Sequence, residues 1–243
     1  MMKKSLPLLI ILPLLLSSCK QIGKNENTAM QKAQVVSSVM TKETQEKLTP
    51  DEVFKELVEG NKRFQSGNIT LRNFNEQARK SAIKQYPKAV ILSCLDSRVP
   101  VETIFDQGLG DVFVGRVAGN FVNEDLLGSM EFACHMAGSK LILVIGHQHC
   151  GAIKGAIDNV EFGNITAMLS KIKPAVRMSQ NFTGKKSSKN EEFVKYVSRN
   201  NVSYTLDQIR KNSPVLREME NKKEIKIVGA YYNLANGNLE FVK

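Results

Sequence analysis

The chain has little cysteine, with four residues in 243. If lipid occupies one of them, as the N-terminus suggests below, an odd number remains, which argues against a disulfide framework in an oxidising compartment. The remaining thiols then need another form of protection, and a bound metal provides one. The chain also lacks a Gly-x-Gly-x-x-Gly segment that opens a helix after a strand, so a dinucleotide-binding loop is not predicted.

Basic residues exceed acidic ones, with 34 Lys and Arg against 24 Asp and Glu and a formal net charge of +10. Loss of residues 1–18, which contain two lysines and no acid, would lower that charge to +8. The lysines are scattered, and no basic stripe alternates with aromatic residues as in single-strand binders. We therefore expect no nucleic-acid partner, whereas weak attraction to an anionic membrane surface is compatible with this charge.

The N-terminus has the three parts of a secretory signal. Two lysines precede a short apolar run, Leu6 to Leu16, and small residues lead to Cys19. The apolar run is too short for an uninterrupted spanning helix, which needs about 20 apolar residues. The tetrapeptide Leu-Ser-Ser-Cys ending at Cys19 resembles a bacterial lipobox, and the alternative is an ordinary signal peptide with an accidental cysteine.

We expect residues 1–18 to be a lipoprotein signal peptide and Cys19 to carry the lipid. Residues 19–45 are polar and are expected to form a tether. The catalytic domain is then expected to span residues 46–243. Because Lys20 rather than Asp follows the cysteine, the expected location is the cell envelope, periplasmic or anchored in the outer membrane.

Apolar runs alternate with helical patterns, which predicts an α/β fold with a mainly parallel central sheet flanked by helices. Four runs are apolar throughout, as in strands buried on both faces: 89–93, 112–117, 141–145 and 225–229. A capping box with proline at the first helical position opens a helix at Thr49, and further helices are expected over 123–138 and 194–209. An Asn-Gly turn at 236–237 predicts a closing hairpin.

Reactive side chains follow two of the predicted strands. Cys94 comes directly after the first strand, and His147 and Cys150 follow the strand at 141–145. Ligands in open parallel sheets bind beyond the carboxyl ends of strands, so the three side chains converge if these strands are neighbours. Two thiolates and one imidazole suit Zn²⁺, and three protein ligands leave one tetrahedral position for water. An open position indicates catalysis, because structural zinc sites usually have four protein ligands.

Asp96 and Arg98 lie two and four residues beyond the first thiolate. A carboxylate beside a guanidinium stays ionised and can accept a hydrogen bond from a hydroxide on the metal. The alternative is that Asp96 binds the zinc as a fourth ligand and closes the site. The sequence leaves both roles open.

The pattern Cys94-x-Asp96-x-Arg98, followed by His147-x-x-Cys150-Gly151, resembles the signature of the β-carbonic anhydrases. Similar segments extend over residues 49–242. The resemblance implies reversible hydration of CO2 to bicarbonate and a proton by zinc-bound hydroxide. It also implies Cys94, His147 and Cys150 as zinc ligands, Asp96 with Arg98 as the catalytic pair, and a homodimer or homotetramer with the active site near a subunit interface.

Three residues are candidate substrate contacts: Phe132, Gln107 and Gly151. Phe132 stands where some family members have tyrosine and is expected to line an apolar CO2 pocket. Gln107 is a candidate hydrogen-bond donor to the substrate, and many family members have their glutamine one position further along this segment. Tryptophan is absent, so the inhibitory bicarbonate pocket of one subclass is not expected.

His149 is a candidate proton shuttle, because an unperturbed histidine titrates near neutral pH. Against this role, consecutive side chains point in different directions, so the ring of His149 is expected to point away from the adjacent ligand segment. Two rival functions remain open at this stage. One is attack by the same hydroxide on COS or CS2, and the other is a non-catalytic zinc lipoprotein whose site Asp96 closes.

Overall fold

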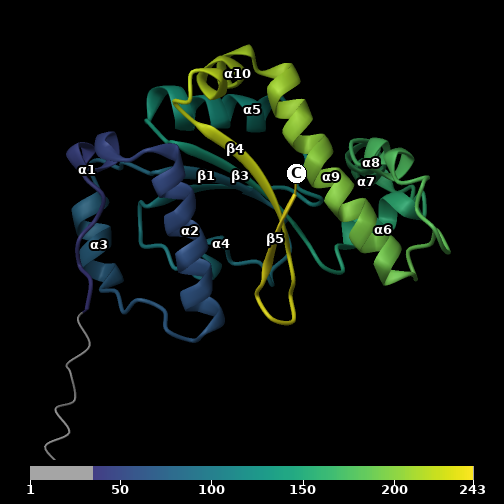
Figure 1. The fold of residues 1–243 in the computed structure, drawn as a ribbon, viewed down its shortest axis with the longest axis horizontal. Helices are drawn as coiled ribbons and strands as arrows, with labels where there is room; N and C mark the ends of the chain where they lie inside the picture. The colour runs from purple at the N-terminus through teal and green to yellow at the C-terminus, as the bar shows by residue number, and fades with distance from the viewer. Residues whose placement is uncertain (1–34, 243) are drawn as a thin grey trace, which may run out of the picture. The chain divides into compact units, whose positions relative to one another are not determined.

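Five strands form one sheet in the computed structural model, which describes residues 35–242. Their order across the sheet is β2-β1-β3-β4-β5, and the first four run parallel while β5 is antiparallel to β4 (Figure 1). The predicted mainly parallel sheet is therefore confirmed. The strands are β1 (Ala89–Ser93), β2 (Val112–Arg116), β3 (Leu141–His147), β4 (Lys226–Tyr232) and β5 (Leu239–Val242).

The two central strands β1 and β3 are buried along their whole length, as their continuous apolar sequence predicts. They pair in parallel, with Ala89 opposite Leu141 and Ser93 opposite Ile145. Their carboxyl ends therefore lie at the same edge of the sheet. The segments that follow them, which carry the predicted metal ligands, leave the sheet side by side.

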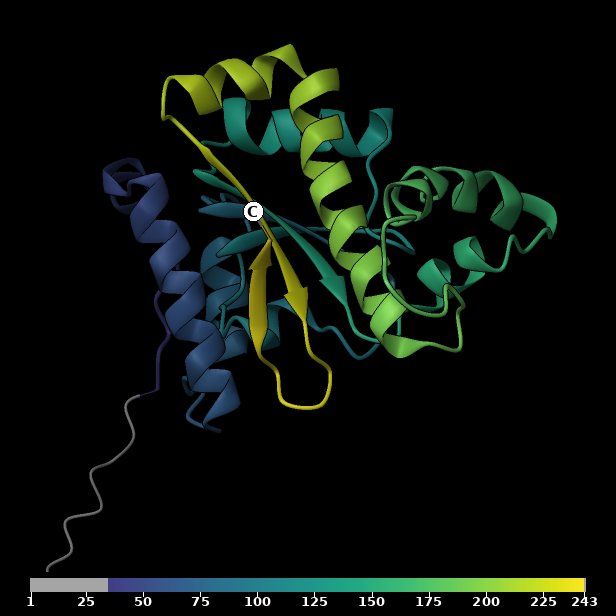
Figure 2. The same ribbon diagram turned by 45° about the vertical axis from the view of Figure 1, so that its right-hand side comes forward.

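Helices cover both faces of the sheet. One face packs against α5, α9 and α10, and the other against α2 and α4. In Figure 2, α9 crosses the sheet while α2 lies on the other side of the strands. The helices packed on the two faces are α2 (Pro50–Gln65), α4 (Val101–Ile104), α5 (Glu124–Glu131), α9 (Glu191–Asn212) and α10 (Pro214–Asn221). The structure also has α1 (Lys42–Lys47), α3 (Phe74–Ser81), α6 (Gly151–Ile157), α7 (Gly163–Ser170) and α8 (Lys173–Met178).

A third apolar cluster lies under the carboxyl ends of β1 and β3. It joins α6, α7 and α8 to the first turns of α9, and both Cys94 and Cys150 belong to it. The predicted metal ligands thus sit at the border of a packed core. Contacts with this cluster hold the two cysteine side chains in place.

The predicted helix over 123–138 has a different form in its second half. Helix α5 ends at Glu131, and Phe132–Met136 form a π-helical turn that the amide of Ala137 closes on the carbonyl of Phe132 at 2.9 Å. Cys134 lies on this turn and is buried. Burial raises the pKa of its thiol to about 12, so Cys134 behaves as a small apolar side chain.

Helix α1 spans the predicted boundary between tether and domain at residue 46, and residues before that boundary also contact the rest of the chain. The amide of Val36 donates to the carbonyl of Leu71 at 2.8 Å. The buried Gln45 donates from Nε2 to the carbonyls of Pro87 and Ala137, both at 2.8 Å. The polar sequence of this segment does not indicate such packing, because Gln45 contributes through hydrogen bonds and not through apolar contact.

The predicted signal peptide, Cys19 and most of the predicted tether lie outside the described residues. Within residues 35–242, none of the helices combines the length and apolar character that crossing a membrane requires.

Candidate metal centre

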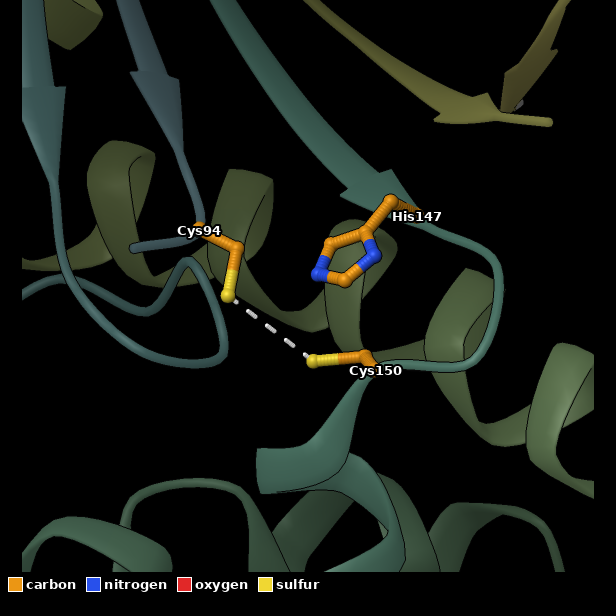
Figure 3. A group of neighbouring side chains, drawn as sticks. All are labelled: Cys94, His147 and Cys150. Carbon is orange, nitrogen blue, oxygen red and sulfur yellow. Dashed lines mark hydrogen bonds between the residues drawn. The ribbon is translucent and has the colours of Figure 1, made fainter. Parts of the chain in front are cut away.

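Cys94, His147 and Cys150 come together at the carboxyl edge of the sheet (Figure 3). Cys94 follows β1, His147 is the last residue of β3, and Cys150 is the N-cap of α6. All three side chains are buried, and their ligand atoms lie within 4.8 Å of one another. The predicted convergence is therefore confirmed, and the register of β1 with β3 is its cause.

The spacing of the two sulfur atoms fits a zinc ion. The Sγ atoms of Cys94 and Cys150 lie 3.9 Å apart. Two sulfurs bound at about 2.3 Å to one tetrahedral zinc would be separated by about 3.8 Å. The donor set therefore has the chemistry and the spacing that zinc requires.

His147 presents one ring nitrogen to the thiols. Its Nδ1 donates to the carbonyl of Gln148 at 2.8 Å, which places the proton on Nδ1 and leaves the lone pair of Nε2 free. Nε2 is buried and has no hydrogen-bond partner among the described residues. Buried polar atoms without a partner are rare. A metal ion facing Nε2 would supply the missing partner, and the carbonyl of Gln148 would hold the ring in the right tautomer.

The two thiols are hydrogen-bonded and shift each other's pKa in opposite directions. A hydrogen bond from Cys150 is the largest influence on Cys94 and, with a smaller contribution from His147, lowers the pKa of Cys94 to about 4 against the effect of burial. The same interaction and burial raise the pKa of Cys150. Zinc binding must therefore displace the proton that Cys150 retains, so affinity for zinc falls as the pH falls.

Gly119 supports Cys94 from the loop after β2. Its amide donates to the Sγ of Cys94 at 3.4 Å. Its φ is +86°, and a Cβ at this position would lie 2.3 Å from the Cδ1 of Ile172. Helix α9 holds the loop in place, because Asn201 donates from Nδ2 to the carbonyl of Gly119 at 2.8 Å and Thr205 donates to that of Asn120 at 3.2 Å.

Asp96 lies beside His147 and accepts two hydrogen bonds from the side chain of Arg98. The guanidinium donates from Nε to Oδ1 at 2.9 Å and from Nη2 to Oδ2 at 2.8 Å. These hydrogen bonds hold the pKa of Asp96 well below its usual range. Oδ2 is 3.9 Å from the Nε2 of His147. Since Arg98 engages both oxygens, this arrangement favours the orienting role of Asp96 over metal ligation.

Of the three predicted substrate contacts, Gly151 directly follows a residue of this cluster, while Phe132 and Gln107 have other neighbours. Gly151 is adjacent, as the first residue of α6. Phe132 is 56% exposed and packs against Phe113, with ring centroids 6.3 Å apart, beside a hollow of about 630 Å³ that residues of β2 and α5 line. Gln107 is buried, and its Nε2 donates to the carbonyl of Phe105 at 2.7 Å. Their substrate roles stay predictions.

His149 is turned out of the cluster. Its φ is +56°, and its Nδ1 lies 2.6 Å from the carboxylate of Glu191. Lys154 donates to the other oxygen of that carboxylate at 2.5 Å. The shuttle role of His149 stays a prediction.

The fold is that of a known enzyme class. A β-carbonic anhydrase of Aspergillus fumigatus superposes with a TM-score of 0.62 at 22% identity, covering 79% of this chain and 89% of that one. The β-carbonic anhydrase CcaA superposes with a TM-score of 0.61, also at 22% identity, covering 78% and 98%. Identities this low establish the fold alone, and the fold is that of the β-carbonic anhydrases.

Sequence comparison establishes the family. The family model described as carbonic anhydrase matches residues 89–239. A carbonic anhydrase of Mycolicibacterium smegmatis is 33% identical over 199 residues, which cover 79% of this chain and 92% of that protein. Carbonic anhydrase 2 of Mycobacterium tuberculosis is 34% identical over 196 residues, covering 77% and 90%. This chain belongs to the carbonic anhydrase family.

Replacement of Gly119 tests the support of Cys94. We expect Gly119→Ala to destabilise the protein by about 2 kcal/mol, because the positive φ is unfavourable and the new methyl meets Ile172. Displacement of the amide should also weaken zinc binding. Chemical denaturation and competition with a zinc chelator measure the two effects.

Gly128→Ala is the matched control, since Gly128 lies within α5 and a Cβ there has no neighbour within 4 Å. Alanine should leave stability unchanged or raise it by about 1 kcal/mol. If the two variants had the same stability and the same zinc affinity, the role of Gly119 in supporting Cys94 would be contradicted.

Proposed function

We propose that this chain catalyses the zinc-dependent, reversible hydration of CO2 to bicarbonate and a proton. The carrying observation is the buried cluster of Cys94, His147 and Cys150 with the Asp96–Arg98 pair beside it. Membership of the carbonic anhydrase family supports the same reaction. An intact Asp96–Arg98 pair also argues for catalysis over a purely structural zinc site.

Cys94, His147 and Cys150 would hold the zinc through their two sulfurs and one imidazole nitrogen. When bound, zinc supplies a Lewis acid that lowers the pKa of a water molecule to about 7. Two anionic thiolates donate more charge than neutral imidazoles would. We therefore expect activity to be greater at mildly alkaline pH than at neutral pH.

Asp96 and Arg98 contribute orientation. Arg98 keeps Asp96 ionised, and an ionised carboxylate can only accept hydrogen bonds. Asp96 can thus accept a hydrogen bond from the hydroxyl group of the nucleophile, which would direct a lone pair of that oxygen at CO2. The grip of Arg98 on both oxygens also restrains the carboxylate from turning toward the thiols, where it would compete for the metal position.

Loss of one metal ligand tests the reaction. We expect the zinc-loaded wild type to hydrate CO2 faster than buffer alone at pH 8 and above, as a stopped-flow assay with a pH indicator would show. Cys150→Ser should lose zinc and reduce kcat/KM by more than about 100-fold, the upper end of losses seen for residues that only support a ligand.

Cys134→Ala is the control, because Cys134 is also a buried thiol but lies on the π-helical turn, outside the ligand cluster. It should retain zinc and activity. If the zinc-loaded wild type hydrated CO2 no faster than buffer alone, the proposed function would be contradicted.

We further propose that the chain works as a homodimer or homotetramer. The apolar hollow over β2, with half-exposed Phe132 at its border, supports an interface on this edge of the sheet. A structural neighbour from Sordaria macrospora, with a TM-score of 0.59, is described as tetrameric. Sedimentation should find an oligomer at micromolar concentration and a smaller species for Phe132→Glu. A monomeric wild type would rule out the assembly.

We also propose attachment to the cell envelope through lipid on Cys19. The support is the order of basic residues, the short apolar run and the lipobox-like tetrapeptide in residues 1–19. In bacteria expressing the full chain, labelled fatty acid should enter the wild type and place it in the membrane fraction. Cys19→Ser should carry no label, and an unlabelled, soluble wild type would refute the anchor.

A further inference from the structure

Arg116, the last residue of β2, reaches across to the loop after β1. Its Nε donates to the carbonyl of Cys94 at 3.1 Å, and its Nη2 donates to the carbonyl of Asp96 at 2.6 Å. One guanidinium therefore holds the backbone of a zinc ligand and the backbone of the orienting carboxylate.

The position of Arg116 follows from the sheet. Strand β2 pairs in parallel with β1, and Arg116 is the register partner of Ser93, the residue before Cys94. The amide of Val117 also donates to the carbonyl of Ser93 at 3.1 Å. The arginine thus stands at the carboxyl edge of the sheet, level with the start of the ligand loop.

The loop is buried at both ends, at Cys94 and Val99, but makes few apolar contacts between them. Leu95, between the two carbonyls that Arg116 holds, is 66% exposed and gains little from apolar packing. The carbonyl of Asp96 also accepts a hydrogen bond from the amide of Val99 at 3.2 Å. Local bonds therefore close the turn at 96–99, while Arg116 ties that turn to the sheet.

We propose that Arg116 is a positioning residue that fixes the Cys94 thiol and the Asp96 carboxylate relative to each other. The planar guanidinium offers several donors in a fixed geometry, so it can hold two carbonyls at once. A lysine ammonium is a point charge on a flexible stem and does not reproduce that geometry. Arg116 is exposed, so its contribution comes from geometry more than from its screened charge.

The inference rests on the proposed zinc site but not on the identity of the substrate. Arg116→Met keeps the length of the side chain and removes both donors. We expect it to speed the release of zinc to a chelator by about tenfold, the lower end of losses seen when a ligand loses its support. We expect kcat to fall with little change in KM, because the ligand loop rather than the substrate is displaced.

Amide hydrogen exchange gives a readout that needs no zinc. In the metal-free protein, exchange at Arg98 and Val99 should be faster in Arg116→Met, because their amides bond to Asp96, whose backbone is then free to move. Arg116→Lys should lie between the wild type and the methionine variant in all three measurements, since one ammonium can hold only one carbonyl well.

Arg217→Met is the matched control. Arg217 is also exposed and donates from Nη1 to a backbone carbonyl, that of Arg210, at 3.1 Å, but it lies on α10. It should match the wild type in zinc release, exchange at 98–99 and kcat.

If Arg116→Met released zinc and exchanged the amides of residues 98 and 99 at the rates of the wild type, the positioning role would be overturned, whatever the activity of the variant. A wild-type protein that binds zinc but does not hydrate CO2 would instead contradict the proposed function. The role of Arg116 would then still be decided by zinc release and exchange.

Discussion

Parallel pairing of β1 with β3 is the constraint on which the site depends. With Ser93 opposite Ile145, the chain leaves both strands at one edge of the sheet, and Cys94 meets His147 and Cys150 there. A slip of one residue would turn every side chain of a strand to the opposite face. Because both faces of β1 and β3 pack against apolar layers, a shifted register would have to repack both layers, so the stability of the core and the geometry of the metal centre have the same origin.

Around this constraint, the site is stiffened by hydrogen bonds to the backbone. Helix α9 holds the carbonyl of Gly119 through Asn201, the amide of Gly119 reaches Cys94, and Arg116 spans the loop from Cys94 to Asp96. The carbonyl of Gln148 orients His147, while Arg98 orients the side chain of Asp96. Cys94, His147 and the orienting Asp96 thus each have a support, and the supports come from separate parts of the fold.

The sequence predicted the strands and the metal centre because both depend on patterns local in the chain. Apolar runs placed β1 correctly and β3 to within two residues of its end, and reactive residues directly after these strands indicated the site. Gly119, Asn201 and Arg116 were missed because they act through backbone atoms distant in sequence, which leave no spacing to read. The hydrogen bonds of Gln45 to the carbonyls of Pro87 and Ala137 were missed for the same reason. Phe132 and Gln107 were proposed by resemblance, and their contacts in this structure are with the ring of Phe113 and the carbonyl of Phe105.

The central claim is that two sulfurs and one imidazole nitrogen bind a single zinc and leave a position for solvent. X-ray absorption at the zinc edge, combined with metal analysis of the purified protein, tests it most directly. The account predicts one zinc per chain, two sulfur ligands at about 2.3 Å, and one imidazole with one further light atom at about 2.0–2.1 Å. A chain that binds no zinc, or a zinc shell without two sulfurs, would contradict it.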